Sequence, residues 1–181
     1  MRTLIYKTFY GLPLHNIVGI MALLAIVWIL LARYFQKRES RRRLWKFGNS
    51  LMFMGMISII IIITMVSRSE GTEVILIPFH SFIEARIQPE MYRSMLMNVF
   101  LFFPLGLTLP YALLEKWKGR VLMTILFALI FSVAIECLQY YFKLGRAETD
   151  DVICNTLGYT IGTIPYWLSN IPSKRGNLDE L

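Results

Sequence analysis

The chain has 181 residues and a formal net charge of +7, with 56% hydrophobic and only 17% charged residues. Soluble domains contain about 45–50% apolar and about 25% charged residues, so this chain has too few polar side chains to cover a surface that faces water. The composition excludes a disordered protein, a disulfide-stabilised scaffold and an ordinary cytosolic enzyme, and it predicts an integral membrane protein.

Five apolar stretches have the length and composition of membrane-spanning helices, which need about 20 mostly apolar residues each. We therefore predict an all-α protein, a polytopic transmembrane helix bundle of about five spans. The first stretch is expected to be a span and not a cleaved signal peptide, because its apolar run is too long and no site of small residues follows it. The expected spans are residues 17–35, 50–67, 95–114, 121–142 and 152–168.

A cluster of basic residues separates the first two expected spans. Seven of the 19 Lys and Arg residues fall between Arg33 and Lys46. Short loops rich in Lys and Arg lie in the cytoplasm, and such clusters contact anionic lipid headgroups. Further basic residues lie within 116–120 and 174–175, and with five spans all three basic segments fall on the same side of the membrane. This side is expected to be the cytoplasm, which predicts an N-terminus outside the bacterial cell membrane and a C-terminus in the cytoplasm. No nucleic-acid motif accompanies the charge, so nucleic acid is not an expected partner.

One long connection, after the second span, contains a short apolar segment near 74–82. The segment is too short to span a membrane and too apolar for a hydrated loop, and Pro78 ends any regular element within it. We expect a short re-entrant or interfacial segment with Phe79 and Phe82 at the depth of the lipid headgroups.

Several polar side chains lie inside or beside the last three spans, where a charged group costs about 2.5–3.5 kcal/mol at a helix centre. The predicted topology brings all of them, from four regions of the chain, to the outer third of the membrane. A structural network of paired side chains and a polar cavity open to the outside both remain possible interpretations. The residues concerned are Asn98, Glu136, Gln139, Arg146, Asp150, Asp151 and Asn155.

The fifth expected span has small and polar residues on one face. Asp151, Asn155, Gly158 and Gly162 are spaced four, three and four residues apart, which aligns them along a helix. Small residues let a neighbouring backbone approach closely, so this stripe is expected to face the interior of the protein.

The sequence contains no pattern that indicates a cofactor or a metal. Cys137 and Cys154 lie in apolar segments, outside any Cys-x-x-Cys or Cys/His spacing. We expect no cofactor, no resident metal and no structural disulfide.

Four motifs occur in order at separations that resemble the VanZ-like family of bacterial membrane proteins. They are ILIPF at 75–79, NVFLFFPLG at 98–106, the pair Glu136 and Gln139, and Arg146 followed by DDVICNTLG at 150–158. The family often has asparagine at the start of the first motif, where Ile75 stands here. The resemblance covers residues 74–165. It implies a polytopic membrane protein of Gram-positive-type bacteria, and the member that gives the family its name is associated with resistance to teicoplanin, a lipoglycopeptide antibiotic.

The resemblance divides the chain into three parts. Residues 1–67 form a two-helix membrane segment with a basic cytoplasmic loop, residues 68–168 form a VanZ-like membrane domain, and residues 169–181 form a cytoplasmic tail. We expect membrane lipids as partners, together with a lipid-linked envelope component or a lipoglycopeptide.

Two functions remain open at this stage. The first is a binding protein at the outer membrane face that contributes to resistance, with a site formed by Phe79, Asn98, Glu136, Gln139, Arg146, Asp151 and Asn155. The second is an intramembrane enzyme acting on a phospholipid or a polyprenyl-linked substrate. Its candidate catalytic residues are Glu136 as a base, Arg146 as a phosphate clamp, and Asp150 or Asp151 as an acid or a metal ligand. A transporter is disfavoured, because the chain has no internal repeat and its polar groups gather at one end of the spans.

Overall fold

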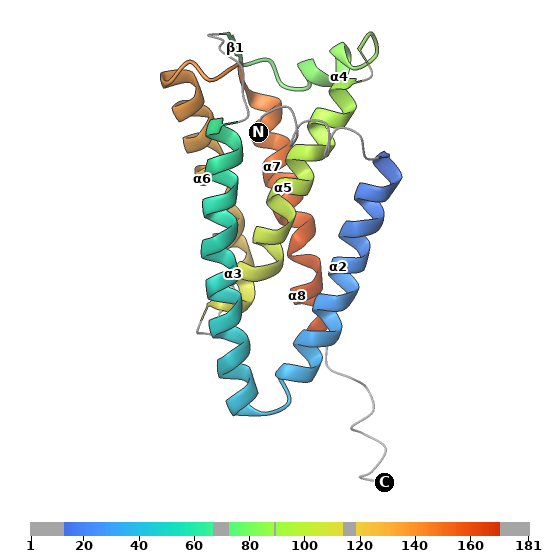
Figure 1. The fold of residues 1–181 in the computed structure, drawn as a ribbon, viewed down its shortest axis with the longest axis vertical. Coiled ribbons are helices and arrows are strands. Elements are labelled where there is room, and N and C mark those ends of the chain that lie inside the picture. The colour runs from blue at the N-terminus through green and yellow to red at the C-terminus, as the bar shows by residue number, and fades with distance from the viewer. Residues whose placement is uncertain (1–12, 67–72, 89, 114–118, 171–181) are drawn as a thin grey trace.

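The computed structural model describes residues 13–66, 73–88, 90–113 and 119–170, and it confirms the expected all-α fold class (Figure 1). Most of these residues are helical, and the long helices run along the long axis of the molecule. The elements in chain order are α2 (Leu14–Phe35), α3 (Glu39–Val66), β1 (Val74–Ile75), α4 (His80–Glu84), α5 (Glu90–Ala112), α6 (Arg120–Tyr141), β2 (Ala147–Glu148), α7 (Thr149–Gly162) and α8 (Ile164–Ser169).

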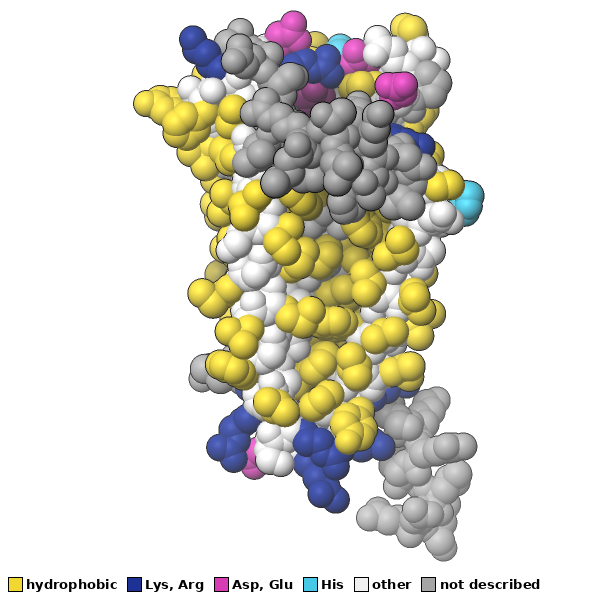
Figure 2. All heavy atoms as spheres, viewed as in Figure 1, with side chains coloured by type: hydrophobic (Ala, Val, Ile, Leu, Met, Phe, Trp, Pro, Cys, Tyr) yellow, Lys and Arg dark blue, Asp and Glu magenta, His cyan; other side chains and the backbone are white. Residues whose placement is uncertain are grey.

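Four of the helices, α2, α3, α5 and α6, are long and apolar enough to cross a membrane. The 22 residues of α2 or α6 extend about 33 Å at 1.5 Å per residue, which matches a hydrocarbon core of about 30 Å. Large apolar side chains such as Leu23, Leu30 and Ile62 point away from the bundle. Figure 2 shows these apolar side chains covering the middle of the bundle, with Lys and Arg side chains gathered below them.

The fifth expected span is not one helix, because 152–168 falls on two consecutive helices, α7 and α8. The break lies at Thr163, whose backbone N–H donates to the carbonyls of Tyr159 and Thr160 at 3.1 Å. Pro165 follows in the first turn of α8. Proline has no backbone N–H, and its ring collides with the carbonyl four residues earlier, so one helix ends and another begins here. The two helices continue in the same direction along the bundle (Figure 1).

Helix α5 is the central helix and packs against α2, α3, α6 and α7. It remains helical through Pro104 and Pro110, although proline has no backbone N–H to donate within the helix. Its most extensive contact is with α7, whose glycines meet the α5 backbone directly. A Cβ atom on Gly158 would collide with the Val99 carbonyl, and one on Gly162 with the Phe103 carbonyl. The predicted interior stripe on this helix is therefore confirmed.

The two ends of the bundle differ in structure and in charge. At the end where α5 and α7 begin, β1 pairs in parallel with β2, with Val74 opposite Ala147 and Ile75 opposite Glu148. We call this the network end, after the hydrogen bonds described below. The opposite end carries the turn between α2 and α3, the start of α6 and the end of α8, and we call it the basic end (Figures 1 and 2).

Several sequence-based expectations lie outside the described residues: the positions of the two termini and of the basic residues Lys116, Lys118, Lys174 and Arg175. The division into residues 1–67, 68–168 and 169–181 stays a prediction.

Candidate functional site

The site is built around Asp150, in the first turn of α7, which is 2% exposed. Its Oδ1 accepts the backbone N–H of Phe79 at 2.6 Å, and its Oδ2 accepts that of Ser81 at 2.7 Å. Phe79 has a left-handed backbone (φ 63°), which a bulky side chain rarely adopts. The Asp150 carboxylate therefore stabilises an unfavourable turn at the start of α4.

Glu148, at the end of β2, connects this turn to the charged residues around it. Its Oε2 accepts the hydroxyl of Ser81 at 2.9 Å, and its Oε1 accepts Nε of Arg146 at 2.8 Å. Arg146 also lies 3.5 Å from Oε2 of Glu84 on α4. Glu148 is 9% exposed, and a buried carboxylate is tolerated only when it is paired in this way.

Two further bonds connect the turn to the spanning helices. Glu136 of α6 accepts the backbone N–H of Glu148 at 3.1 Å through its Oε2. Asn98 of α5 donates through Nδ2 to Oδ1 of Asp151 at 2.6 Å. We call the eight residues joined here the polar network. They are Ser81, Glu84, Asn98, Glu136, Arg146, Glu148, Asp150 and Asp151.

Two of the predicted site residues bond elsewhere. Gln139 is fully buried and donates to the backbone carbonyl of Thr64 on α3 at 3.2 Å. Asn155 lies one helical turn beyond Asp151 and donates to the hydroxyl of Ser132 on α6 at 2.9 Å. Both amides connect pairs of helices outside the polar network.

Three members of the polar network, Ser81, Glu84 and Glu148, were not among the candidates from sequence. Glu148 lies between Arg146 and Asp150 in the chain, but its role depends on the pairing of β2 with β1. Ser81 and Glu84 lie 67 and 62 residues before Glu148 and Arg146, respectively. The local sequence around them carries no signal for this contact.

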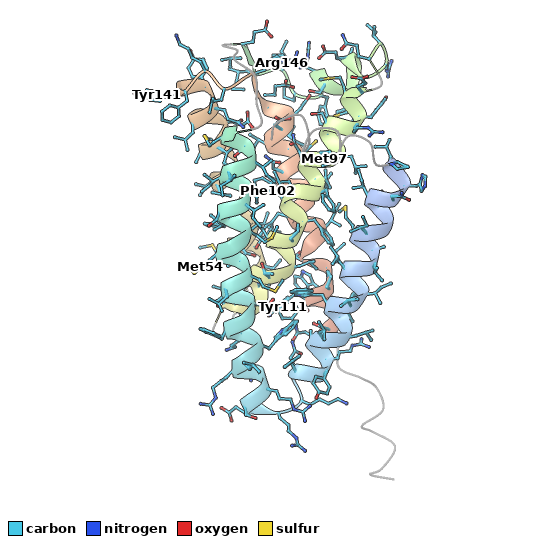
Figure 3. All side chains as sticks on the ribbon, in the orientation of Figure 1. Met54, Met97, Phe102, Tyr111, Tyr141 and Arg146 are labelled. Carbon is cyan, nitrogen blue, oxygen red and sulfur yellow. The ribbon has the colours of Figure 1, made fainter. Side chains whose placement is uncertain are left out.

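Arg146 is the cationic member of the polar network and its side chain is about one-third exposed (Figure 3). Burial by itself would lower the pKa of its guanidinium, but the charges of Glu148 and Glu84 and the hydrogen bonds to them outweigh burial and raise it. Arg146 is therefore a permanent cation with part of its surface open to a ligand. His80 lies beside it, with Nδ1 3.9 Å from Oε2 of Glu84.

An apolar surface adjoins these charged groups. The side chains that follow β1 and those on and after α4 point outward, and the Phe79 and Phe82 rings contact each other at 5.9 Å between centroids. We call this set the apolar rim. Its members are Leu76, Ile77, Phe79, Phe82, Ile83 and Ile87, and each is between 42% and 82% exposed.

The arrangement is suited to binding an amphiphile more than to holding a metal. Among the described residues, no group of three His, Cys, Asp or Glu side chains comes together in the way metal ligands do. Both oxygens of Asp150 and both of Glu148 accept hydrogen bonds from protein groups. These carboxylates hold the turn and Arg146 in position.

Comparisons with known proteins show which proteins this chain is similar to. Protein VanZ of Enterococcus faecium is 34% identical over 90 residues, which are 50% of this chain and 54% of that protein. The chain thus matches about half the length of this relative. No solved structure matches the chain. The VanZ/LLP1 family matches residues 3–170, which extends well beyond the region of resemblance at 74–165, and the chain belongs to this family.

Proposed function

We propose that this protein binds an amphiphilic envelope molecule at the outer face of the bacterial cell membrane and contributes to resistance against teicoplanin-type glycopeptides. The molecule would be a lipid-linked wall component or the antibiotic itself. The observation that carries the proposal is the position of Arg146, a partly exposed cation 3.5 Å from Glu84, which directly follows Ile83 of the apolar rim in α4.

The chemistry of the two surfaces supports this type of ligand. An anionic or strongly polar headgroup can accept hydrogen bonds from Arg146, whereas an acyl or polyprenyl chain removes Phe79, Phe82 and Leu76 from water. Binding sites for small molecules commonly combine apolar walls with a few fixed polar groups. The polar network supplies the fixed part, because Glu148 and Glu84 hold the guanidinium from two sides.

The charge distribution supports an outward orientation of the network end. Arg33 and the cluster from Arg38 to Lys46 belong to the opposite end, and Arg33 reaches the carbonyl of Leu168 at 3.2 Å. Segments rich in Lys and Arg remain in the cytoplasm. The network end would then lie outside, with the apolar rim dipping into the outer leaflet as an interfacial segment.

The polar network favours binding over catalysis. A general acid or base must be free to exchange a proton with its substrate. Asp150 instead uses both oxygens for the backbone of Phe79 and Ser81, and Glu136 uses one for the backbone of Glu148. An enzyme acting on a phospholipid or a polyprenyl-linked substrate is thus the second proposal, with Arg146 as its phosphate clamp.

A resistance assay with two pairs of variants tests the proposal. Susceptible bacteria would express the parent chain, Arg146→Ala or Phe79→Ala, and the minimal inhibitory concentration of teicoplanin would be measured. The controls are Arg43→Ala and Leu23→Ala, which remove an exposed cation and an exposed apolar side chain outside the site. We expect the site variants to lose most of the protection and the controls to retain it, at equal amounts of protein in the membrane.

A second antibiotic separates the two parts of the site. If the apolar rim binds the acyl chain of teicoplanin, Phe79→Ala should leave protection against a glycopeptide without an acyl chain unchanged. Full protection by both Arg146→Ala and Phe79→Ala would refute the proposed site. Turnover of a labelled polyprenyl-linked substrate by the purified parent chain, abolished by Arg146→Ala, would favour the enzyme.

A further inference from the structure

A cavity of about 150 Å³ lies at the basic end, far from the polar network. Its walls come from five helices: the ends of α2, α5 and α8 and the beginnings of α3 and α6. Figure 3 shows Tyr111, one of its buried lining residues, at this end of the molecule and Arg146 at the other. The lining residues are Gln36, Arg42, Trp45, Lys46, Tyr111, Arg120, Tyr166 and Asn170.

Three of the lining residues are cations, and no Asp or Glu is among the described residues that line the cavity. Arg120 is 5% exposed. Its Nη1 makes only long hydrogen bonds, 3.3 Å to the hydroxyl of Tyr166 and 3.4 Å to the carbonyl of Pro110. Its Nη2 is buried and has no hydrogen-bond partner in the part of the chain that the structure describes.

This arrangement is unfavourable for an empty cavity. A buried guanidinium is costly unless an anion or several acceptors compensate its charge. Among the described residues, the Arg120 guanidinium meets two neutral oxygens at long distance and the Tyr166 ring, whose centroid is 6.0 Å away. Arg42 and Lys46 add positive charge to the same space, where like charges repel. An anion in the cavity would provide the missing partner for Arg120 and remove this repulsion.

We propose that the cavity binds a phosphate group. Arginine donors in a planar fork match the oxygens of a phosphate, and lysine adds a compact positive charge. Tyr166 accepts a hydrogen bond from Arg120, so its own hydroxyl proton can be donated to a ligand. The phosphate can come from an anionic phospholipid or from a soluble phosphate compound.

The surroundings of the cavity favour a lipid headgroup. Tyr34 and Trp167 are more than half exposed close to the ends of α2 and α8. Such aromatic side chains are enriched at the depth of the headgroups. A phospholipid at this depth could place its phosphate in the cavity and its acyl chains against the apolar surface of the bundle.

Binding to the purified full-length chain in detergent tests the proposal. Phosphatidic acid would be titrated and followed by native mass spectrometry, and inorganic phosphate would be titrated separately by calorimetry. Arg42→Gln is the main variant, because Arg42 is exposed and its loss leaves the core untouched, and Arg120→Gln is the second. The matched control is Arg43→Gln, which removes the same charge from the neighbouring position on α3 but does not line the cavity.

We expect Arg42→Gln to weaken binding of phosphatidic acid by about tenfold, as the loss of a charge-assisted hydrogen bond predicts, and Arg43→Gln to weaken it by less than about twofold. If Arg42→Gln also weakens binding of inorganic phosphate more than Arg43→Gln does, the cavity binds a soluble phosphate compound. If the two variants differ only in binding of phosphatidic acid, the cavity binds the lipid. Equal effects of Arg42→Gln and Arg43→Gln, or no effect of either, would overturn the proposal, because binding would then reflect only the general charge of this end.

Discussion

Asp150 accepts the backbone N–H of Ser81 at 2.7 Å across 69 residues of sequence, and this bond connects the start of α7 to the start of α4. The same carboxylate also accepts the N–H of Phe79, the residue of this turn that has a left-handed backbone. This buried carboxylate therefore helps to hold the apolar rim in position, together with the pairing of β1 with β2.

Asp150→Asn should detach this turn. The amide oxygen can accept one of the two N–H groups, but the amide NH₂ opposes the other, which leaves a buried donor unsatisfied at a cost of about 1–3 kcal/mol. We expect faster proteolysis within 73–88 and a lower melting temperature in detergent. Glu73→Gln, an exposed carboxylate at the same end, is the control and should leave both unchanged. Equal melting temperatures for Asp150→Asn and the parent would contradict this role of the carboxylate.

Gly158→Ala should disrupt the packing of α5 on α7. The new Cβ would collide with the Val99 carbonyl, which belongs to a helix backbone and can move only with the helix. Overpacking at such a contact costs about 1–3 kcal/mol, and we expect the upper part of this range here. Thermal unfolding in detergent measures the loss. Gly55→Ala is the matched control, because nothing lies within 4 Å of its Cβ position, and the better helix propensity of alanine should raise stability by up to about 1 kcal/mol. A similar response of both variants would contradict the close approach.

The hydrogen bond between Asn98 and Asp151 should appear as a coupling energy. A double-mutant cycle with Asn98→Ala and Asp151→Ala isolates the pair from the other contacts of each residue. Because Asp151 is nearly buried and the bond is short, we expect a coupling of about 1–2 kcal/mol, near the upper end for bonds between membrane helices. Asn155→Ala combined with Asn98→Ala is the control cycle, since Asn155 bonds to Ser132, and it should show a much smaller coupling. Equal couplings in the two cycles would show that the pair does not act as a unit.

The contribution of Arg146 to stability should be insensitive to alkaline pH. Burial lowers the pKa of Arg146, but Glu148 and Glu84 outweigh this effect and raise the pKa above its ordinary value. A group whose pKa is raised on folding contributes its full stabilisation at pH values below its pKa in the unfolded chain. This stabilisation is lost only as the pH rises through the pKa of the group in the folded protein. The ion pairs of the parent chain should therefore persist up to about pH 11.

Arg146→Lys provides the test, because lysine ordinarily titrates near pH 10.4. Melting temperatures at pH 8 and pH 11 should diverge for this variant more than for the parent chain, as the lysine loses its charge. Arg43→Lys, at an exposed position, measures the general effect of one additional lysine. If Arg146→Lys and Arg43→Lys lose the same stability at pH 11, the ion pairs of Arg146 do not contribute.

Hydropathy and length were sufficient to predict most of the helices. Uniform apolar runs of the required length form α2, α3, α5 and α6. In the hydrocarbon core of a membrane, backbone N–H and C=O groups have no water to bond, and a helix satisfies them within the same segment. The fifth run was predicted as one span because apolar content does not register a helix break. The break between α7 and α8 lies beside Pro165, which has no backbone N–H for a helical hydrogen bond. Such a local effect is not visible in the mean hydropathy of the run.

The candidate site was predicted in part. The sequence identified Glu136, Arg146, Asp150 and Asp151, because charged residues beside apolar runs need partners, and it placed them at one end of the bundle. It did not identify Ser81, Glu84 or Glu148. Gln139 and Asn155 were assigned to the same group but connect other helices, because helical spacing defines a face without defining what packs against it.

The sequence by itself determined the class of this protein, the places of its four long apolar helices and the end of the bundle that carries most of the acidic and amide groups. These properties follow from composition and from short-range periodicity. Only the tertiary structure decided which groups meet, namely Asp150 with the turn at Phe79 and Ser81, and Arg42, Lys46 and Arg120 around one cavity. Such partners lie tens of residues apart, and their contact depends on the angles and offsets at which whole helices pack.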